Sequence, residues 1–273
     1  MEKVQKSARS YLFVPANRVE RFEKALSTSA DAIIVDLEDA VPVDLKISAR
    51  ETLKYWLMEH PHKNVMIRIN SKNSEWFADD IQLAKFSNVE AIVLPKAESV
   101  ADIDAVTTIR AMDIFALIET PLGFANIRQI SQAKSVKALM FGSIDFQLEM
   151  NMQGGYEELL SFRNEFVLAS KLAGIESPID GVTVDFTDEA LVEKETLQAK
   201  NLGFAGKLCI HPKQVDIVNT AFSPTDVEIE WAQRVLDAIN QAQGQAISLD
   251  GKMIDLPVIL RAQKILKQAG LNT

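Results

Sequence analysis

The sequence predicts an α/β protein, a (β/α)₈ barrel of the TIM-barrel architecture followed by a C-terminal helical arm. Strand-like and helix-like segments alternate eight times between residues 11 and 214. Strict alternation implies parallel strands joined by right-handed crossovers, and eight such units suffice to close a barrel. A doubly wound open sheet is the alternative, but no glycine-rich phosphate loop follows the first strand to support it.

Each strand is predicted from a short apolar run that ends at polar or turn residues. The predicted strands are residues 11–14, 32–36, 65–70, 91–95, 114–119, 136–141, 178–186 and 205–210. Apolar residues at helical spacing predict the intervening helices within residues 18–26, 42–58, 76–86, 100–109, 156–173 and 189–202. A short helical link is expected between the fifth and sixth strands.

Residues 1–222 are predicted to form the barrel and residues 223–273 the arm. The arm begins with a helix-like segment, 224–242, followed by a polar, glycine-containing connection, 243–251. A final helix begins near Pro257, a residue well suited to a first helical turn. Eight units close a barrel without this arm, so we expect it to pack on its own barrel or on that of another subunit.

The composition is that of an ordinary soluble protein, with 47% hydrophobic and 25% charged residues. No apolar run approaches the roughly 20 residues that span a bilayer, and the N-terminus does not have the pattern of a signal peptide. The single cysteine, Cys209, excludes an internal disulfide framework, and we expect it to be buried. A net charge of −9 argues against nucleic acid or an anionic membrane as partner. These features predict a cytoplasmic protein.

Two neighbouring predicted strands each end beside an acidic residue. Residues 114–118 lead into Glu119, and residues 136–141 lead through a short turn to Asp145. The carboxyl ends of parallel strands lie at one face of a barrel, where catalytic groups are found. Two carboxylates with open coordination positions suit Mg²⁺. A salt-bridged or solvated pair is the other interpretation, and the residues alone leave both open.

Arg68 lies near the end of an otherwise apolar strand and needs a carboxylate partner, because an unpaired buried guanidinium is costly. The partner is either an internal residue such as Glu38 or the carboxylate of a substrate, which the guanidinium can bind through two hydrogen bonds. Both interpretations stay open.

Two further polar residues have a structural interpretation. His211 follows the eighth strand and precedes a proline; it could be a general base, but we favour a structural or ligand-lining role. Asp255 opens the last helix, where capping accounts for an acidic residue.

The sequence resembles the citrate lyase β-subunit-like group of the HpcH/HpaI aldolase and malyl-CoA lyase superfamily. The matching stretches occur in the family's order and extend over nearly the whole chain. They are LFVPAN (12–17), VDLEDAV (35–41), IRIN (67–70), AIVLPK (91–96), LIETP (117–121), FGSIDF (141–146), GKLCIHPKQ (206–214) and GKMIDLP (251–257).

The resemblance implies a TIM barrel that oligomerises, commonly as a homotrimer, with the arm over a neighbouring subunit. It implies that Glu119 and Asp145 hold Mg²⁺ and that Arg68, with Glu38 nearby, binds the carboxylate of an α-keto acid. Phe13 and His211 match positions along the CoA or carrier-bound pantetheine arm. Asp255 matches the general acid/base that enters the adjacent subunit's active site.

The implied activity is that of a Mg²⁺-dependent carbon–carbon lyase. It would cleave or form a citryl-, malyl- or citramalyl-type 3-hydroxy-3-carboxyacyl thioester, giving an α-keto acid and an acyl thioester. Ile144 and Ala16 depart from residues common in the family, acidic and glycine respectively, and leave the acyl group and its carrier open.

Three alternatives remain. One is a malyl-CoA-type thioesterase. Another is a class II pyruvate aldolase acting on free hydroxy-keto acids, although such relatives use an early active-site histidine and the loop after the second strand has none. The last is a non-catalytic subunit in which Asp255 is only a helix residue.

Overall fold

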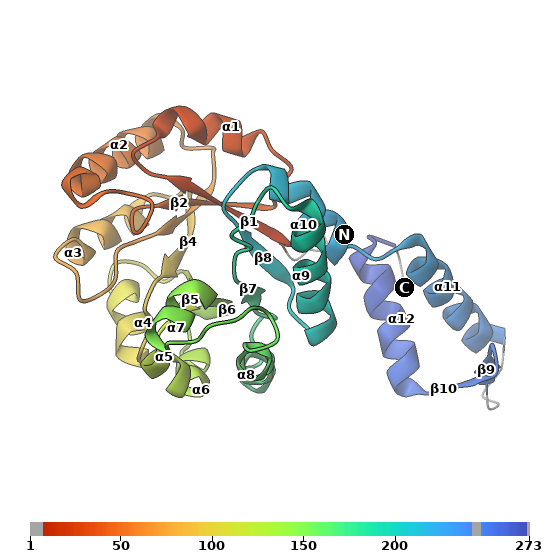
Figure 1. The fold of residues 1–273 in the computed structure, drawn as a ribbon. Coiled ribbons are helices and arrows are strands. Elements are labelled where there is room, and N and C mark those ends of the chain that lie inside the picture. The colour runs from red at the N-terminus through yellow and green to blue at the C-terminus, as the bar shows by residue number, and fades with distance from the viewer. Residues whose placement is uncertain (1–7, 242–246, 272–273) are drawn as a thin grey trace. The chain divides into compact units, whose positions relative to one another are not determined.

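The computed structural model describes residues 8–241 and 247–271. The chain divides into two compact units, Ala8–Asn219 and the region from Thr220 onward. In Figure 1 the first unit is a ring of strands with helices around it, and the second contains the helix pair α11 and α12.

The first unit is a closed eight-stranded barrel, which confirms the predicted fold. Each strand pairs in parallel with the next, and β8 pairs with β1 to close the ring. The strands are β1 (Ser10–Pro15), β2 (Ala32–Asp36), β3 (Val65–Arg68), β4 (Val89–Leu94), β5 (Asp113–Ile118), β6 (Val136–Phe141), β7 (Ile179–Asp180) and β8 (Gly206–Cys209).

Alternate strand residues point into the barrel and form one buried apolar cluster. It contains a residue from every strand, including Tyr11, Ile34, Met66, Val93, Leu117, Met140, Ile179 and Leu208. Because the interior is filled, the open space lies at the ends of the strands. The strand residues between these face outward, as Lys207 and the buried Cys209 do on β8.

The α-helices of this unit follow the strands in order. They are α1 (Phe22–Leu26), α2 (Lys46–Glu59), α3 (Phe77–Asp80), α4 (Val100–Thr107), α5 (Pro121–Ala125), α6 (Ile127–Ser131), α7 (Ser143–Glu149), α8 (Leu160–Ala173) and α9 (Glu189–Leu202). Short 3₁₀ helices η1 (Val19–Arg21), η2 (Val43–Leu45) and η3 (Ile81–Lys85) adjoin α1, α2 and α3. The next helix, α10 (Lys213–Phe222), crosses the boundary between the units.

Two of the differences from the predicted elements concern the seventh strand and the third helix. The seventh strand was expected over 178–186 but has two paired residues. After them comes Gly181, where a Cβ would meet the carbonyl oxygen of Phe141 at 2.8 Å, so the chain passes too close to β6 to carry a side chain. The helix expected over 76–86 is split into α3 and η3, and at their junction the buried carboxylate of Asp80 accepts hydrogen bonds from the backbone N–H and the side-chain amide of Asn70.

The second unit contains α11 (Asp226–Gln241) and α12 (Leu256–Gln268), joined through an antiparallel hairpin of β9 (Ile247–Leu249) and β10 (Lys252–Ile254). The two helices bury a small core of Ala232, Val235, Ala262, Ile265 and Leu266. The predicted polar connection over 243–251 contains β9 and the hairpin turn, and its residues 243–246 lie outside the described residues. Asp250 and Gly251 both have positive φ, as a two-residue hairpin turn requires.

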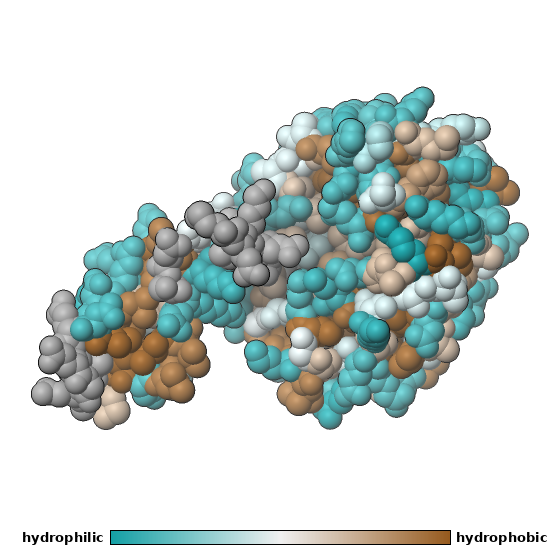
Figure 2. Space-filling view, turned by 180° about the vertical axis from the view of Figure 1, so that it is seen from behind, coloured by the Kyte–Doolittle hydropathy of each residue, from teal (hydrophilic) through white to brown (hydrophobic). Residues whose placement is uncertain are grey.

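The surface of the second unit carries exposed hydrophobic side chains, visible as a brown area in Figure 2. Those described include Val227, Met253, Leu256 and Leu260. None of the helices in the described part of the chain combines the length and apolar character needed to cross a membrane.

Candidate functional site

A cavity of about 350 Å³ opens at the carboxyl ends of the barrel strands. Four of the predicted site residues line it: Phe13 from β1, Arg68 from β3, Glu119 after β5 and Asp145 from α7. The barrel topology therefore brings together side chains that are up to 132 positions apart in the sequence, and three of the four are charged. His211 is not among the lining residues, although its neighbour Ile210 is.

Glu119 is held at the base of this cavity with one oxygen fixed and the other open. Its side chain is buried, and its Oε1 accepts a hydrogen bond of 2.9 Å from the backbone N–H of Lys96. A Cβ at Gly142 would lie 2.5 Å from Oε2, so only glycine lets this oxygen occupy its place. Burial raises the pKa of Glu119 well above its ordinary value, and the nearby carboxylates of Glu38 and Asp145 raise it further.

Asp145 belongs to the first turn of α7 and is half-buried. Its carboxylate has no hydrogen bond or ion pair with any of the described residues. Within that same part of the chain, no group of three or more His, Cys, Asp or Glu side chains is arranged to hold a metal ion. A cation at Glu119 and Asp145 would therefore have two protein carboxylates and take its other ligands from water or substrate, as Mg²⁺ does.

The donor set fits a hard divalent cation. Within the described residues the Glu119 carboxylate accepts a hydrogen bond only at Oε1, and the Asp145 carboxylate has no partner, so both side chains have carboxylate oxygens available as ligands. A cation between them would also relieve the mutual repulsion that raises the pKa of Glu119.

Arg68 has an internal partner that the sequence reasoning missed. Its Nε donates to Oδ1 of Asp36 at 2.7 Å and its Nη2 to Oδ2 at 2.6 Å, a two-pronged contact. The expected contact with Glu38 is also present, at 3.1 Å from Nη1. Asp36 and Arg68 are neighbours in the β2–β3 register, and this pairing was the signal that could have identified them. The guanidinium lies 4.7 Å from the centre of the Phe13 ring.

Glu38 is buried beside Arg68 and is only partly satisfied. Its Oε1 lies 3.5 Å from Nζ of Lys96, whereas Oε2 forms the ion pair with Arg68 at an angle too poor for a hydrogen bond. Burial raises its pKa; Arg68 and Lys96 oppose this effect and Asp39 and Asp36 add to it, so that the pKa is about 7.

His211 and Asp255 occupy other positions. The ring of His211 stacks on Phe186 with 4.4 Å between centroids, and its Nδ1 accepts a hydrogen bond from the backbone N–H of Lys213. Burial and two lysines lower its pKa. Asp255 is exposed in the second unit and caps α12 by accepting from the N–H of Val258 at 3.2 Å.

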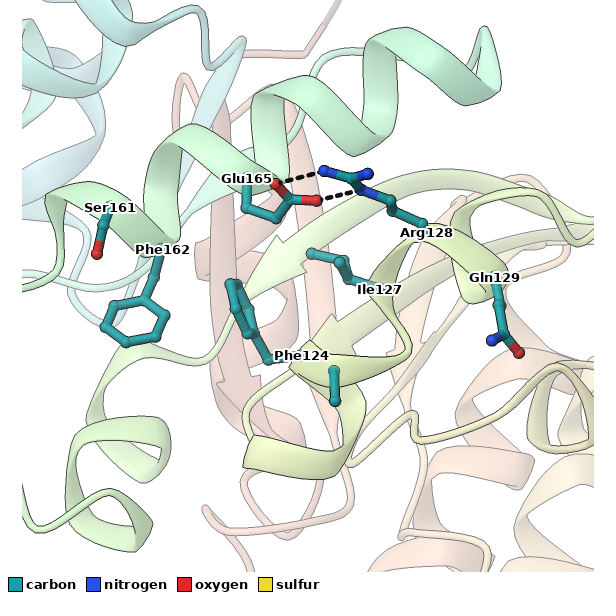
Figure 3. A pocket seen from close by; sticks show the side chains of 8 residues that line it. Phe124, Ile127, Arg128, Gln129, Ser161, Phe162 and Glu165 are labelled. Atoms are coloured by element: carbon teal, nitrogen blue, oxygen red, sulfur yellow. Dashed lines mark hydrogen bonds and ion pairs between the residues drawn. The ribbon is translucent and has the colours of Figure 1, made fainter.

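A second cavity of about 520 Å³ lies away from the strand ends, between α5–α6 and α8. Figure 3 shows Phe124 and Phe162 at one side of it and the Arg128–Glu165 ion pair at the other. The two residues of this pair, with 2.6 Å between Nε and Oε1, are the charged residues of the lining, and their opposite charges cancel. We therefore place the candidate site at the smaller cavity, where acidic groups are in excess.

Comparison with known proteins gives consistent matches over the chain. Residues 9–212 match the family described as HpcH/HpaI aldolase/citrate lyase, and residues 158–272 match a carbon–carbon bond lyase family of the TIM-barrel fold.

Relatives with assigned names include a (3S)-malyl-CoA thioesterase from Cereibacter sphaeroides, 34% identical over 96% of this chain and 94% of that protein. The citrate lyase subunit beta of Leuconostoc mesenteroides is 32% identical over 97% of this chain and 94% of its own.

Among solved structures, CitE from Mycobacterium tuberculosis, in complex with magnesium, acetoacetate and coenzyme A, has a TM-score of 0.85. It is 30% identical and covers 97% of this chain and 99% of its own. The barrel, the strand-end carboxylates and these matches agree: the chain belongs to the HpcH/HpaI aldolase/citrate lyase family.

Proposed function

We propose that the protein is a Mg²⁺-dependent carbon–carbon lyase. Its substrate is a 3-hydroxy-3-carboxyacyl thioester of the malyl, citramalyl or citryl type, and its products are an α-keto acid and an acyl thioester. The observation that carries the proposal is the pair Glu119 and Asp145, two carboxylates with open oxygens at one cavity beside Arg68.

Glu119 and Asp145 would hold the metal, and the N–H of Lys96 fixes the Glu119 carboxylate through its Oε1. Bound Mg²⁺ would act as a Lewis acid on the oxygens of the substrate. The start of α7 after Gly142 adds backbone N–H groups that suit the substrate carboxylate.

Cleavage breaks the bond between the α and β carbons of the acyl chain. The electron pair passes to the thioester, which leaves as an enolate. The hydroxyl-bearing carbon becomes the carbonyl carbon of the α-oxo acid, and the hydroxyl proton passes to solvent. Asp255 is the residue that we assign to protonate the enolate carbon, or to remove that proton in the condensation direction.

Assembly of the complete site would need a second copy of the chain. Exposed Met253 and Leu256 flank Asp255 on the surface of the second unit, and apolar side chains there favour a protein-covered position. We propose a homotrimer in which this arm covers a neighbour's cavity, with Phe13 and His211 along the thioester's carrier.

The test is a product assay. Purified protein with Mg²⁺ is incubated with malyl-, citramalyl- and citryl-CoA, and keto acid and free thiol are measured separately. A lyase releases keto acid without free thiol. Release of keto acid only from free hydroxy-keto acids would contradict the proposed substrate class. Full activity of an Asp255→Asn variant would contradict the role proposed for Asp255.

Thioester hydrolysis is the second candidate, because the Cereibacter relative carries that name at 34% identity over 96% of the chain. The same assay distinguishes it, since hydrolysis of malyl-CoA releases free thiol and malate without keto acid.

A further inference from the structure

We infer that Lys96 is a substrate-binding residue of this site, whose ammonium group binds a negatively charged oxygen of the substrate. The inference rests on the proposed lyase function and concerns a residue to which neither the sequence reasoning nor the family match assigned a role. Three cationic side chains, those of Arg68, Lys46 and Lys96, lie around the carboxylate of Glu38, and their contacts differ.

Two of the three cations already make several internal contacts. Arg68 uses Nε and Nη2 on Asp36, and its Nη1 lies 3.1 Å from Glu38 and 3.4 Å from Asp39. Lys46 is buried, and its ammonium donates to the backbone carbonyl oxygens of Leu37 and Glu38 at 2.9 and 2.7 Å. Each of these two groups is therefore held in place by at least two short internal contacts.

Lys96 is different. Its ammonium has a single contact with the described residues, the 3.5 Å hydrogen bond to Oε1 of Glu38, and its side chain is 44% exposed. An ammonium has three N–H donors, so at least two can bind an incoming anion. Burial lowers the pKa of Lys96, but the carboxylates of Glu38, Glu119 and Asp39 together raise it above its ordinary value.

The backbone of Lys96 holds the residue in this place. Its φ of 49° is in the left-handed region, which residues other than glycine seldom adopt. This conformation coincides with the hydrogen bond from its N–H to Glu119, and the next residue returns to pair with Leu117 of β5. An unfavourable backbone at a site is retained only when the surroundings hold it there.

The proposed substrate supplies the anion. It carries a carboxylate, and the thioester oxygen gains negative charge when the enolate forms. A positioned cation stabilises such an oxygen strongly in a site that excludes water. Lys96 does not line the cavity itself, but its N–H binds Glu119, which does, and its ammonium has at least two donors available for either oxygen.

The test compares Lys96→Met with the wild-type protein in three measurements: Mn²⁺ affinity, affinity for pyruvate in the presence of Mg²⁺, and the exchange of acetyl-CoA methyl protons in D₂O. We expect Mn²⁺ to bind at least as tightly, because a positive charge is removed. Pyruvate affinity or the exchange rate should fall about 10- to 100-fold, as for loss of a hydrogen bond to a charged group. A fall in pyruvate affinity would identify the carboxylate as the group that Lys96 binds, and a fall in the exchange rate would identify the thioester oxygen.

Two further variants separate the side chain from the backbone. Lys96→Gly keeps the N–H and tolerates the positive φ but has no ammonium, so it should match Lys96→Met; Lys96→Arg should recover part of the loss. Lys137→Met is the control, since Lys137 pairs with Asp113 and Glu176 at the start of β6, away from the site.

Three results would overturn the inference. One is wild-type behaviour of Lys96→Gly, and another is a loss in Lys137→Met equal to that in Lys96→Met. The third is weaker Mn²⁺ binding alongside weaker anion binding, which would mean that Lys96 only holds the carboxylates in place. A wild-type protein that turns over no thioester would refute the proposed function instead.

Discussion

Carboxylates outnumber cations around the cavity, and this imbalance explains most of its properties. The acidic residues are Asp36, Glu38, Asp39, Glu119 and Asp145, and the cations nearest to them are Arg68, Lys46 and Lys96. Burial removes the hydration that the charged carboxylates need, and the neighbouring carboxylates add repulsion, so the pKa values of Glu38 and Glu119 rise. A divalent cation is the simplest way to restore balance.

Asp36 should be essential for the stability of the barrel. It is fully buried, pairs with Arg68 and accepts from the N–H groups of Glu38 and Ala40. Asp36→Asn leaves a buried guanidinium without its main partner, which costs about 3–5 kcal/mol. Urea unfolding measures the loss. Glu20→Gln, which removes an exposed partner of Arg18, is the control and should leave the unfolding free energy essentially unchanged.

Glu38 should make stability depend on pH in the metal-free protein. Its pKa is raised from 4.5 to about 7 on folding, so its contribution is fully present below pH 4.5 and is lost as the pH rises through 7. Between pH 5 and 8 the wild-type protein should lose up to roughly 3 kcal/mol relative to Glu38→Gln. Urea unfolding of both proteins in EDTA measures this, and parallel pH profiles would contradict it.

Sequence reasoning identified the residues at strand ends but not their pairings. Glu119, Asp145 and Arg68 were predicted because strand ends converge at one face, and Phe13 was implied by the family resemblance. All four line one cavity. Asp36 was predicted only as the last residue of the second strand, since its pairing with Arg68 depends on the β2–β3 register. The backbone N–H of Lys96 could not be anticipated, because it depends on one unusual φ angle.

The junction between β6 and α7 is the element that decides the geometry of the candidate metal site. Gly142 follows β6, packs against Glu119 and precedes Asp145 by three positions. Gly142→Ala should push the Glu119 carboxylate aside, lowering Mn²⁺ affinity at least tenfold and costing about 1–3 kcal/mol of unfolding free energy through overpacking. Isothermal titration and urea unfolding measure the two effects.

Gly155→Ala provides the matched control for this junction, since a Cβ at Gly155 meets no atom within 4 Å. Equal metal affinity in the Gly142→Ala and Gly155→Ala variants would show that Gly142 does not shape the site.

At the scale of elements, apolar strands and long amphipathic helices were predicted well and short elements were not. The strands 32–36 and 136–141 and the helix 189–202 match the structure at both ends, because burial and periodicity act along the whole segment. The β9–β10 hairpin was missed although Asp-Gly within alternating residues is its sequence signal. The end of β7 depends on a close contact at Gly181 that no local pattern reveals.

The whole molecule consists of a barrel with the candidate site and a second unit that carries Asp255. If the arm of one copy completes the site of another, two inactive variants should complement each other. Glu119→Gln keeps the arm and loses the metal site, whereas Asp255→Asn keeps the metal site and loses the acid. Mixed oligomers, formed by co-expression, should regain lyase activity measured as keto acid release.

The control for complementation is the double variant Glu119→Gln/Asp255→Asn co-expressed with each single variant, which should stay inactive. Failure of the two single variants to restore activity in a verified mixed oligomer would show that Asp255 acts within its own chain or not at all.

The central claim is that Glu119 and Asp145 together hold one divalent cation. Mn²⁺ titration of the wild-type protein, Glu119→Gln and Asp145→Asn, followed by electron paramagnetic resonance, tests it most directly. We predict a single site per chain in the wild-type protein and a loss of affinity in each variant greater than the 10- to 100-fold typical of outer-shell groups. Wild-type affinity in either variant would contradict the claim.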